Sequence, residues 1–176
     1  MKNRTIILFS AILSFAVSAG ALEVTKISTT PVSSMVFSGV IEVTGISLQK
    51  SAVVMPVTEY KGRTYADIKL LSKNLYAKIE ACLSKGVCKN ASGPEPKISV
   101  RGIKMLKSKT RVANAEAVFD GELLVTAGVI NSSREPGDLW IGWPEDFKIN
   151  NAELKTRTEQ LVKEAYAKAL KNPRKK

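Results

Sequence analysis

The chain has 176 residues, of which 27 are Lys or Arg, 16 are Asp or Glu and none is His, giving a formal net charge of +11. Without His, Ser-His-Asp and Cys-His catalysis are excluded within one chain, and with only two Cys the common tetrahedral zinc sites are excluded as well. The positive charge favours an anionic partner, such as nucleic acid, a membrane surface or an acidic polymer, although it also serves plain solubility.

The first 21 residues have the layout of a secretory signal peptide. Lys2 and Arg4 precede an apolar stretch at 5–17, and Ala19 and Ala21 complete an Ala-x-Ala pattern. The stretch is shorter than the about 20 residues of a membrane span, so we expect cleavage after Ala21 rather than retention as an anchor. No later segment is long and apolar enough to cross a membrane. We therefore expect a periplasmic or secreted mature chain, whose loss of two basic residues lowers the formal charge from +11 to +9.

The rest of the sequence reads as two copies of one unit, at 22–89 and 97–171, joined by a linker at 90–96 and followed by a basic tail at 172–176. Four motifs recur in the same order, which chance patterning is not expected to produce. The matched motifs are Val24-Thr25-Lys26-Ile27 with Val100-Arg101-Gly102-Ile103, Val36-Phe37-Ser38-Gly39 with Val118-Phe119-Asp120-Gly121, the apolar strands at 40–45 and 122–128, and Ala52-Val53-Val54-Met55-Pro56 with the segment 139–144.

Strands are expected first in each unit. In the second unit, apolar Ala113, Ala115 and Ala117 alternate with other residues up to Phe119, which predicts a strand with one buried face. Asp120-Gly121 predicts a two-residue hairpin turn, because both positions must accept positive φ, and Ser38-Gly39 is a weaker version of it. A further turn is expected at 135–138 and a last strand at 139–143.

A helix is expected after the proline of each unit. Thr64 and Asp67 are candidate capping residues for the first helix, and Gly86 marks its end. Asn150 or Asn151 marks the start of the second helix. The apolar stripes expected to dock on the sheets are Ile68, Leu71, Leu75, Ile79 and Cys82 or Leu83 in the first helix, and Leu154, Leu161, Ala165 and Ala169 in the second. The predicted fold class is α+β: two tandem units, each a small antiparallel β-sheet with a C-terminal α-helix.

The two cysteines, Cys82 and Cys88, lie at the end of the first expected helix and just beyond it. In an exported chain a disulfide is favoured over free thiols, and the spacing is not the Cys-x-x-Cys of catalytic dithiols. A bridge here would hold the helix end to the linker and contribute about 2–3 kcal/mol in the chain-entropy model.

These pieces, taken in order, resemble the SpoVG family of small bacterial regulators, named for septation and stage V of sporulation. In the first unit the resemblance rests on the opening Val24-Thr25, the strand end Met55-Pro56 and a glycine-led segment at 61–68 that leads through an Asp-Ile pair into the helix. In the second it rests on the hairpin tip Asp120-Gly121 and the segment 138–144 before the final helix. It covers most of both units.

The resemblance implies a small twisted sheet with a terminal helix, and pairing of units through strand edges. A single short sheet leaves unpaired edges that invite such association. The two units could therefore pair within one chain as a pseudo-dimer, or two chains could form a homodimer.

The resemblance also implies nucleic-acid binding, with basic residues after the Met-Pro position and on the helix. The matching residues here are Lys61, Arg63, Lys69, Lys73, Lys148, Lys155 and Arg157. Glu59, Glu145 and Asp146 lie close to the two prolines and would repel phosphate. The densest basic run is Arg101, Lys104, Lys107, Lys109 and Arg111, which could follow a phosphate backbone or could simply be a solvated edge that prevents aggregation.

Trp140 and Trp143 are three positions apart in an expected strand, so they should face opposite sides. One is expected in the core; the other could be an exposed stacking platform or part of the interface between units, and we favour the interface.

No motif indicates catalysis, a metal or another cofactor. The sequence favours an exported, non-enzymatic SpoVG-like protein with a binding or regulatory role, linked by resemblance to septation and nucleic-acid binding. The alternative is an envelope protein–protein interaction module that kept the fold without binding nucleic acid.

Overall fold

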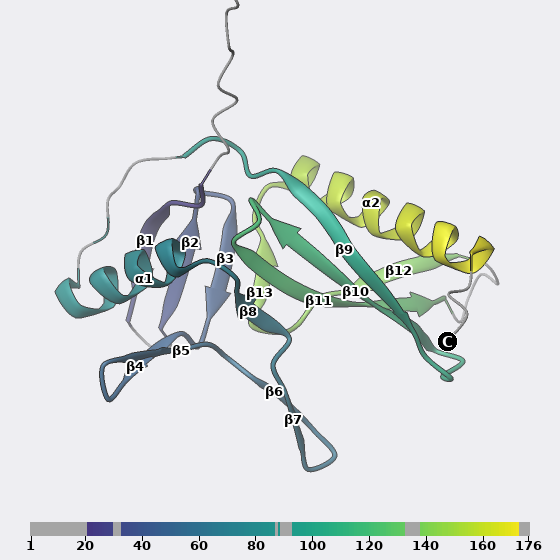
Figure 1. Ribbon diagram of the computed structural model, residues 1–176, viewed down its shortest axis with the longest axis horizontal. Coiled ribbons are helices and arrows are strands. Elements are labelled where there is room, and N and C mark those ends of the chain that lie inside the picture. Colours follow the sequence, from purple (N-terminus) through teal and green to yellow (C-terminus); the bar gives the residue numbers. More distant parts are fainter. Residues whose placement is uncertain (1–20, 30–32, 87, 89–92, 133–137, 173–176) are drawn as a thin grey trace, which may run out of the picture.

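The computed structural model describes residues 21–29, 33–86, 88, 93–132 and 138–172 (Figure 1). The predicted signal sequence up to residue 20, the turn residues 135–137, residues 90–92 of the linker and residues 173–176 of the basic tail lie outside the described residues. The fold of these residues is α+β, as predicted, with antiparallel strands in several sheets and two helices.

The elements occur in the order β1 (Val24–Ser28), β2 (Ser34–Phe37), β3 (Ile41–Thr44), β4 (Ser47–Gln49), β5 (Ala52–Val54), β6 (Thr58–Tyr60), β7 (Arg63–Tyr65), β8 (Ile68–Leu70), α1 (Lys73–Lys85), β9 (Ile98–Met105), β10 (Arg111–Phe119), β11 (Leu123–Asn131), β12 (Leu139–Gly142), β13 (Phe147–Ile149) and α2 (Ala152–Lys171).

Each of the two larger sheets is completed by a strand from the other half of the chain. The first sheet has the order β1-β2-β3-β13, and the second has the order β12-β11-β10-β9 with β8 also paired to β11. Ile149 of β13 lies opposite Ile41 of β3, and Leu70 of β8 lies opposite Leu123 of β11. We refer to this arrangement as the strand exchange. The small hairpins β4–β5 and β6–β7 are separate from both sheets.

The backbone hydrogen bonds at the two ends of each exchanged strand follow the same pattern. At one end the Thr44 amide donates to Asp146 O (2.9 Å), and the Thr126 amide donates to Asp67 O (2.7 Å). At the other end the Asn150 amide donates to Val40 O (2.8 Å) and the Leu71 amide to Glu122 O (2.7 Å). In each of these hydrogen bonds the donor belongs to one half of the chain and the acceptor to the other. Each half is therefore hydrogen-bonded to a strand of the other half.

Two of the sequence matches between the halves are wrong in the structure. Val24 lies opposite Phe37 and Ile98 lies opposite Phe119, so Val24 is equivalent to Ile98 rather than to Val100. A bulge at a different place in each strand pair hides this shift from the sequence. The segments 52–56 and 139–144 also differ, because β5 pairs only with β4 whereas β12 extends the second sheet along β11.

The first helix begins later than its apolar spacing predicts. Residues Ile68–Leu70 form β8, and Ser72 caps α1 by accepting hydrogen bonds from the amides of Asn74 and Leu75. Thr64 and Asp67 therefore do not cap it. Strands also intervene after each proline, since β6, β7 and β8 precede α1 and β13 precedes α2. Ile68 is buried against the second sheet, so pairing with β11 outweighs the local helical pattern.

The other helix ends agree with the sequence. Gly86 ends α1 in the left-handed conformation (φ 66°), and Asn151 caps α2 through its side chain, which accepts a hydrogen bond from the Leu154 amide. The buried stripe of α2 differs from the predicted one. It consists of Leu154, Thr158, Val162 and Tyr166, whereas Leu161, Ala165 and Ala169 are only half-buried beside it.

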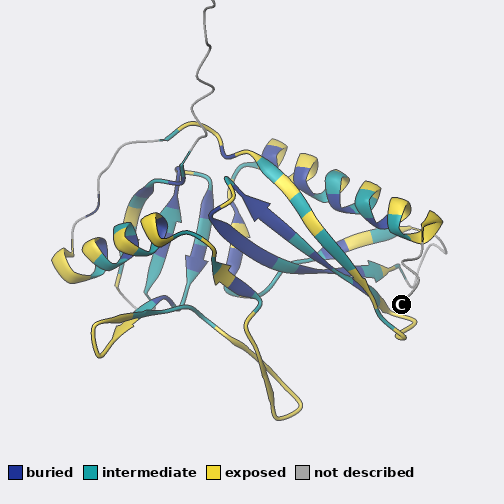
Figure 2. Ribbon diagram, viewed as in Figure 1, coloured by how far each residue is buried: buried dark blue, intermediate teal, exposed yellow. Residues whose placement is uncertain are grey.

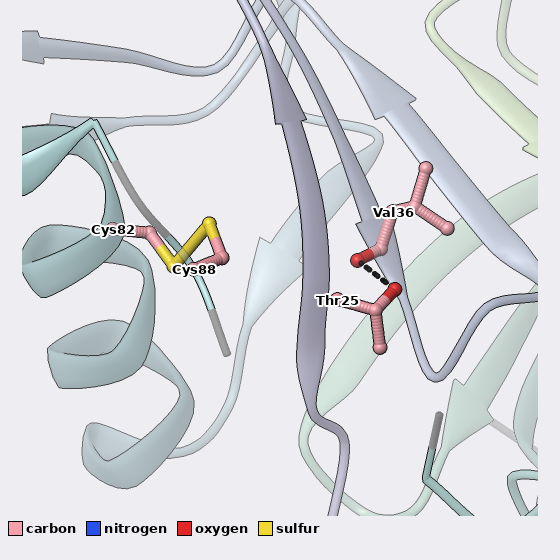
Figure 3. Close-up of a disulfide and its surroundings, with 4 residues drawn as sticks. All are labelled: Thr25, Val36, Cys82 and Cys88. Atoms are coloured by element: carbon pink, nitrogen blue, oxygen red, sulfur yellow. Dashed lines mark hydrogen bonds between the residues drawn. A yellow bond between two sulfur atoms is a disulfide. The ribbon is translucent and has the colours of Figure 1, made fainter. Parts of the chain in front are cut away.

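Cys82 and Cys88 form a disulfide, as predicted, with their Cα atoms 4.9 Å apart. Both residues are buried and belong to the larger core cluster. Figure 3 shows the bridge between the end of α1 and the strands of the first sheet, where Thr25 Oγ1 donates to the Val36 carbonyl at 3.0 Å. The bridge therefore holds Cys88 to the end of α1 and in the core.

Both predicted hairpin turns form with positive φ at their two central residues. The φ angles are 47° and 74° at Ser38-Gly39 and 49° and 71° at Asp120-Gly121. Two positive values are the signature of the type I′ turn that suits the twist of a hairpin. Asp120 Oδ1 also accepts a hydrogen bond from the Lys97 amide at 2.9 Å.

Replacing Asp120 with Asn is expected to stabilise the protein at neutral pH. Burial raises the pKa of the Asp120 carboxyl above its ordinary value, more than the hydrogen bond from Lys97 lowers it. A carboxyl group with a raised pKa in the folded state stabilises the folded protein fully when it is protonated, below the unfolded-state pKa. This contribution is lost as pH rises through the folded-state pKa. Asn at position 120 keeps a side-chain oxygen that can accept the hydrogen bond from the Lys97 amide, and it favours the same turn without carrying a negative charge. Urea unfolding of both proteins from about pH 3 to about pH 7 should show the advantage of D120N growing with pH; a difference that stays constant over this range would contradict the prediction.

The core consists of two clusters that meet at Trp143. The larger cluster joins α1, the first sheet and the exchanged strands, and Phe37 and Phe119 are fully buried within it. The smaller cluster lies between the second sheet and α2, and it includes Ala113 and Ala115, as the alternation predicts. Figure 2 shows this burial in β10 and β11, while the two small hairpins are largely exposed.

Candidate functional site

The densest basic run forms one exposed edge of the second sheet. It comprises Arg101 and Lys104 of β9, Lys107 and Lys109 of the following turn, and Arg111 at the start of β10. We call these residues the basic edge. All are exposed, and β9 is an outer strand of the sheet. Among the described residues none of them takes part in an ion pair, so their charges stay available to a ligand.

The basic edge borders the face of the second sheet that α2 leaves uncovered. Ala113, Ala115, Val129 and Ile141 turn toward α2, so the residues next to them turn to the opposite side. On that side the strand register places four residues in one row across the sheet: Lys104, Asn114, Gly128 and Gly142. We call this side of β9–β12 the open face.

Arg111 is held across the open face. Its Nε donates to Asn114 Oδ1 at 2.8 Å. A Cβ atom at Gly128 would lie 2.8 Å from Arg111 Nε, so only glycine leaves room for the side chain to lie over β11. The guanidinium is therefore positioned before any ligand arrives, which lowers the ordering cost of binding.

Two pockets adjoin the open face, and both include Asp67 and Thr126 in their walls. The first has a volume of about 470 Å³ and combines Lys69 and Lys104 with Asp67 and Glu116. The second, of about 350 Å³, places Arg111 among carboxylates. Its acidic residues are Glu59, Asp67, Glu145 and Asp146. These carboxylates disfavour phosphate inside the pockets, so an anionic ligand is better placed along the basic edge.

The remaining basic candidates do not join this surface as a group. Lys69 lines the first pocket together with Lys104. Lys155 pairs with Glu159 and Arg157 pairs with Glu95, so the charges of these two helix residues are already engaged. The others are spread out: Lys61 and Arg63 lie in the β6–β7 hairpin, Lys73 in the first turn of α1, and Lys148 on β13 opposite Glu42.

The two tryptophans have different surroundings. Trp143 is half-buried where the two core clusters meet; its ring lies 5.1 Å from that of Phe147, and its Nε1 donates to Glu159 Oε1 at 3.2 Å. Trp140 is 52% exposed on the open face. The preferred placement of the second tryptophan in the interface between units is therefore wrong for Trp140, which is exposed, as the other alternative had it.

Sequence reasoning missed Asn114 and Gly128, which position Arg111. The available signals were a polar residue within an alanine-rich strand and a glycine inside a strand, a place where glycine often marks close approach of another group. The sequence did not show which side chain makes that approach, because Arg111 and Gly128 come from neighbouring strands.

Within the described ranges no helix could span a membrane, and no three Cys, Asp or Glu side chains are grouped closely enough to bind a metal ion. No family model, curated protein or solved structure matches this chain.

Proposed function

We propose that the mature chain is an exported, non-enzymatic, SpoVG-like module that binds an anionic polymer, with nucleic acid as the first candidate, along the basic edge. The observation that carries this proposal is the set of five exposed cations on one sheet edge without ion-pair partners among the described residues. Phosphate contacts of this kind supply most of the non-specific affinity for nucleic acids. The resemblance adds a regulatory role linked to septation.

We also propose that the two units form a pseudo-dimer within the chain. The strand exchange supports this, because the contacts of β8 with β11 repeat those of β13 with β3. A chain whose two units pair with each other is less dependent on association with a second copy of the chain. Light scattering at micromolar concentration is expected to give a monomer, and a stable dimer would argue against the pairing.

Neutralising the basic edge is expected to weaken nucleic-acid binding. The variant carries Lys104→Gln, Lys107→Gln and Lys109→Gln in the chain that starts at Leu22. The control carries Lys85→Gln, Lys168→Gln and Lys171→Gln, which remove the same charge from exposed positions on the helices. Affinity for labelled DNA and RNA is measured across a salt series. The slope of log affinity on log salt should fall by about 2–3 in the variant, since each phosphate contact contributes about 0.7–0.9.

The control should keep the slope and affinity of the parent chain. Equal losses in both triple variants would mean that net charge, rather than the basic edge, drives binding. No binding by the parent chain above about 50 mM salt would leave only non-specific attraction and would overturn the proposal.

A second candidate is an envelope protein–protein interaction module, and the β6–β7 hairpin favours it. Figure 1 shows this hairpin projecting from the body of the molecule. Its strand residues are all exposed, including Tyr60 and Tyr65, and Val57 just before it is 48% exposed. Exposed apolar and aromatic side chains on a projecting element are typical of protein contacts. Under this alternative Y60A/Y65A should abolish a cross-link to an envelope protein and leave nucleic-acid affinity unchanged.

A further inference from the structure

An exposed tryptophan lies on the open face in the same cross-strand row as the positioned arginine. Trp140 is opposite Ile130 of β11, and Ile130 is in turn opposite Arg111 of β10, so the three residues form one row across the sheet. A Cβ atom at Gly142 would lie 3.4 Å from Trp140 Cζ3 and 2.8 Å from Ile130 Cδ1. Glycine at this position therefore leaves space for Trp140 and Ile130 to cover the strand.

The charge around this row is positive on the side of the basic edge and mixed where Arg111 borders the second pocket, whose walls also include Glu59, Asp67, Glu145 and Asp146. Arg111 lies over the neighbouring Gly128, Lys104 follows in the next row, and Lys107 and Lys109 lie in the turn at the same end of the strands. The carboxylates of Glu116 and Asp67 line the first pocket, farther along β10 from this end. Phosphates are therefore attracted to the lysines of the basic edge and repelled from the two pockets, whereas the uncharged face of a base can approach Trp140 and Arg111.

We propose that Trp140 and Arg111 form a stacking site for an unpaired base of single-stranded nucleic acid, whose neighbouring phosphates contact Lys104, Lys107 and Lys109. The inference rests on the proposed function and specifies which form of nucleic acid binds. An unpaired base offers its face to an aromatic ring or a guanidinium plane, whereas the bases of a duplex are stacked on one another. Stacking of this kind tolerates any base, so we expect little sequence preference.

The test compares the chain that starts at Leu22 with its W140A and W140F variants. An unlabelled single-stranded oligonucleotide should quench the tryptophan fluorescence of the parent and leave that of W140A, which reports only Trp143, nearly unchanged. The affinity of W140A for single strands should fall about 5- to 100-fold, W140F should retain most of it, and affinity for duplex should stay unchanged. The salt slope should be the same in all three proteins, since no phosphate contact is removed. DNA and RNA oligonucleotides are tested separately.

The outcomes separate this inference from the proposed function. If the parent chain binds nucleic acid and W140A binds single strands equally well, the stacking site is wrong and the basic edge stands. If the parent binds neither form, both fail. If W140A instead abolishes self-association seen by light scattering, the open face is a contact between copies of the chain and the stacking site is overturned.

A second inference concerns Leu22, the first residue after the predicted cleavage position. Its side chain is fully buried, and its backbone N donates to Glu122 Oε2 at 2.8 Å. Ser72 Oγ donates to the other carboxylate oxygen, Glu122 Oε1, also at 2.8 Å. Lys78 Nζ donates to the Leu22 carbonyl at 2.9 Å and pairs with Glu23 at 2.7 Å. The largely buried carboxylate of Glu122 thus accepts a hydrogen bond from the backbone nitrogen of Leu22.

We infer that Glu122 binds the new α-ammonium group that cleavage between Ala21 and Leu22 creates. In the uncut chain the Leu22 nitrogen is an amide with one hydrogen and no charge. After cleavage it is an ammonium group with three donors and a positive charge at neutral pH, and charge-assisted hydrogen bonds to a carboxylate are stronger than neutral ones. Removal of the signal sequence therefore stabilises the fold by an ion pair that the precursor lacks.

This inference is tested by comparing the chain that starts at Leu22 with the same chain acetylated at Leu22. The free amine should raise the thermal midpoint by about 2–4 °C at pH 7. The gain should disappear in E122Q and should be lost as pH rises above about 8, where the amine loses its proton. Equal midpoints of the free and acetylated chains at pH 7 would overturn the inference, as would terminal sequencing of the exported protein that finds a first residue other than Leu22.

Discussion

Neither half of the chain is expected to fold when it is expressed without the other. The half that ends at residue 92 lacks β13, which pairs with β3, and the half that starts at residue 93 lacks β8, which pairs with β11. In the second half the buried residues Leu123–Val125 would then face water along an unpaired edge. Both halves also lose part of the larger core cluster, which contains residues of each.

The size of the effect follows from burial. Phe147 and Ile149 of β13 are nearly fully buried, and each such side chain stabilises a fold by about 1.5–3 kcal/mol. A typical domain is stable by only about 5–15 kcal/mol, and smaller domains have less to lose. Circular dichroism and amide hydrogen exchange of each half should therefore show an unfolded chain. An equimolar mixture should recover strands and a cooperative thermal transition, because the exchanged strands then find their partners.

The matched control is the full chain with a protease site within residues 89–92, cut after folding. It keeps both exchanged strands, so it should retain the secondary structure and most of the stability of the intact protein. A cooperative unfolding transition in either half alone would show that the strand exchange is not needed for folding.

Truncation of Phe119 is expected to cause the largest loss of stability for a single substitution. Phe119 is fully buried at the end of β10, and its ring lies 5.6 Å from that of Phe147 on the exchanged strand β13. F119A should lower the free energy of unfolding by about 3–5 kcal/mol, because it loses apolar burial and leaves a cavity between the two halves. F119L keeps more of the volume and should lose less. Urea unfolding monitored by circular dichroism measures both.

The control for this substitution is L170A. Leu170 is 54% exposed near the end of α2, so its truncation should change the free energy of unfolding by less than about 0.5 kcal/mol. A loss of under about 1 kcal/mol in F119A would mean that the surrounding side chains collapse into the space, and that Phe119 does not hold the halves together.

The features that could be predicted from the sequence depend on residues close together in the chain. Asp120-Gly121 forms its turn because both residues tolerate positive φ, and Asn151 and Gly86 end helices through contacts within one turn. Cys82 and Cys88 are six positions apart at a helix end, which keeps their sulfur atoms within reach.

The candidate site was only partly predictable for the same reason. The run from Arg101 to Arg111 is contiguous, so its gathering on one edge follows from the strand and turn that it forms. Lys155 and Arg157 are as basic as the residues of that run, but in the fold Lys155 pairs with Glu159 and Arg157 pairs with Glu95. Glu95 is far from Arg157 in the chain, so no local pattern shows this pair.

By itself the sequence determined the two predicted hairpin turns, the end of α1, the start of α2, the disulfide and the basic edge, since each depends on residues close together in the chain. Only the tertiary structure decided that Ile68–Leu70 is a strand, that β8 and β13 exchange between the halves, and that Arg111 lies over Gly128 on a face that also exposes Trp140. A short apolar run fits a helix or a strand equally well by its periodicity. The choice between them is made by the free energy of pairing with a distant strand and burying the side chains there, and that depends on residues far away in the chain.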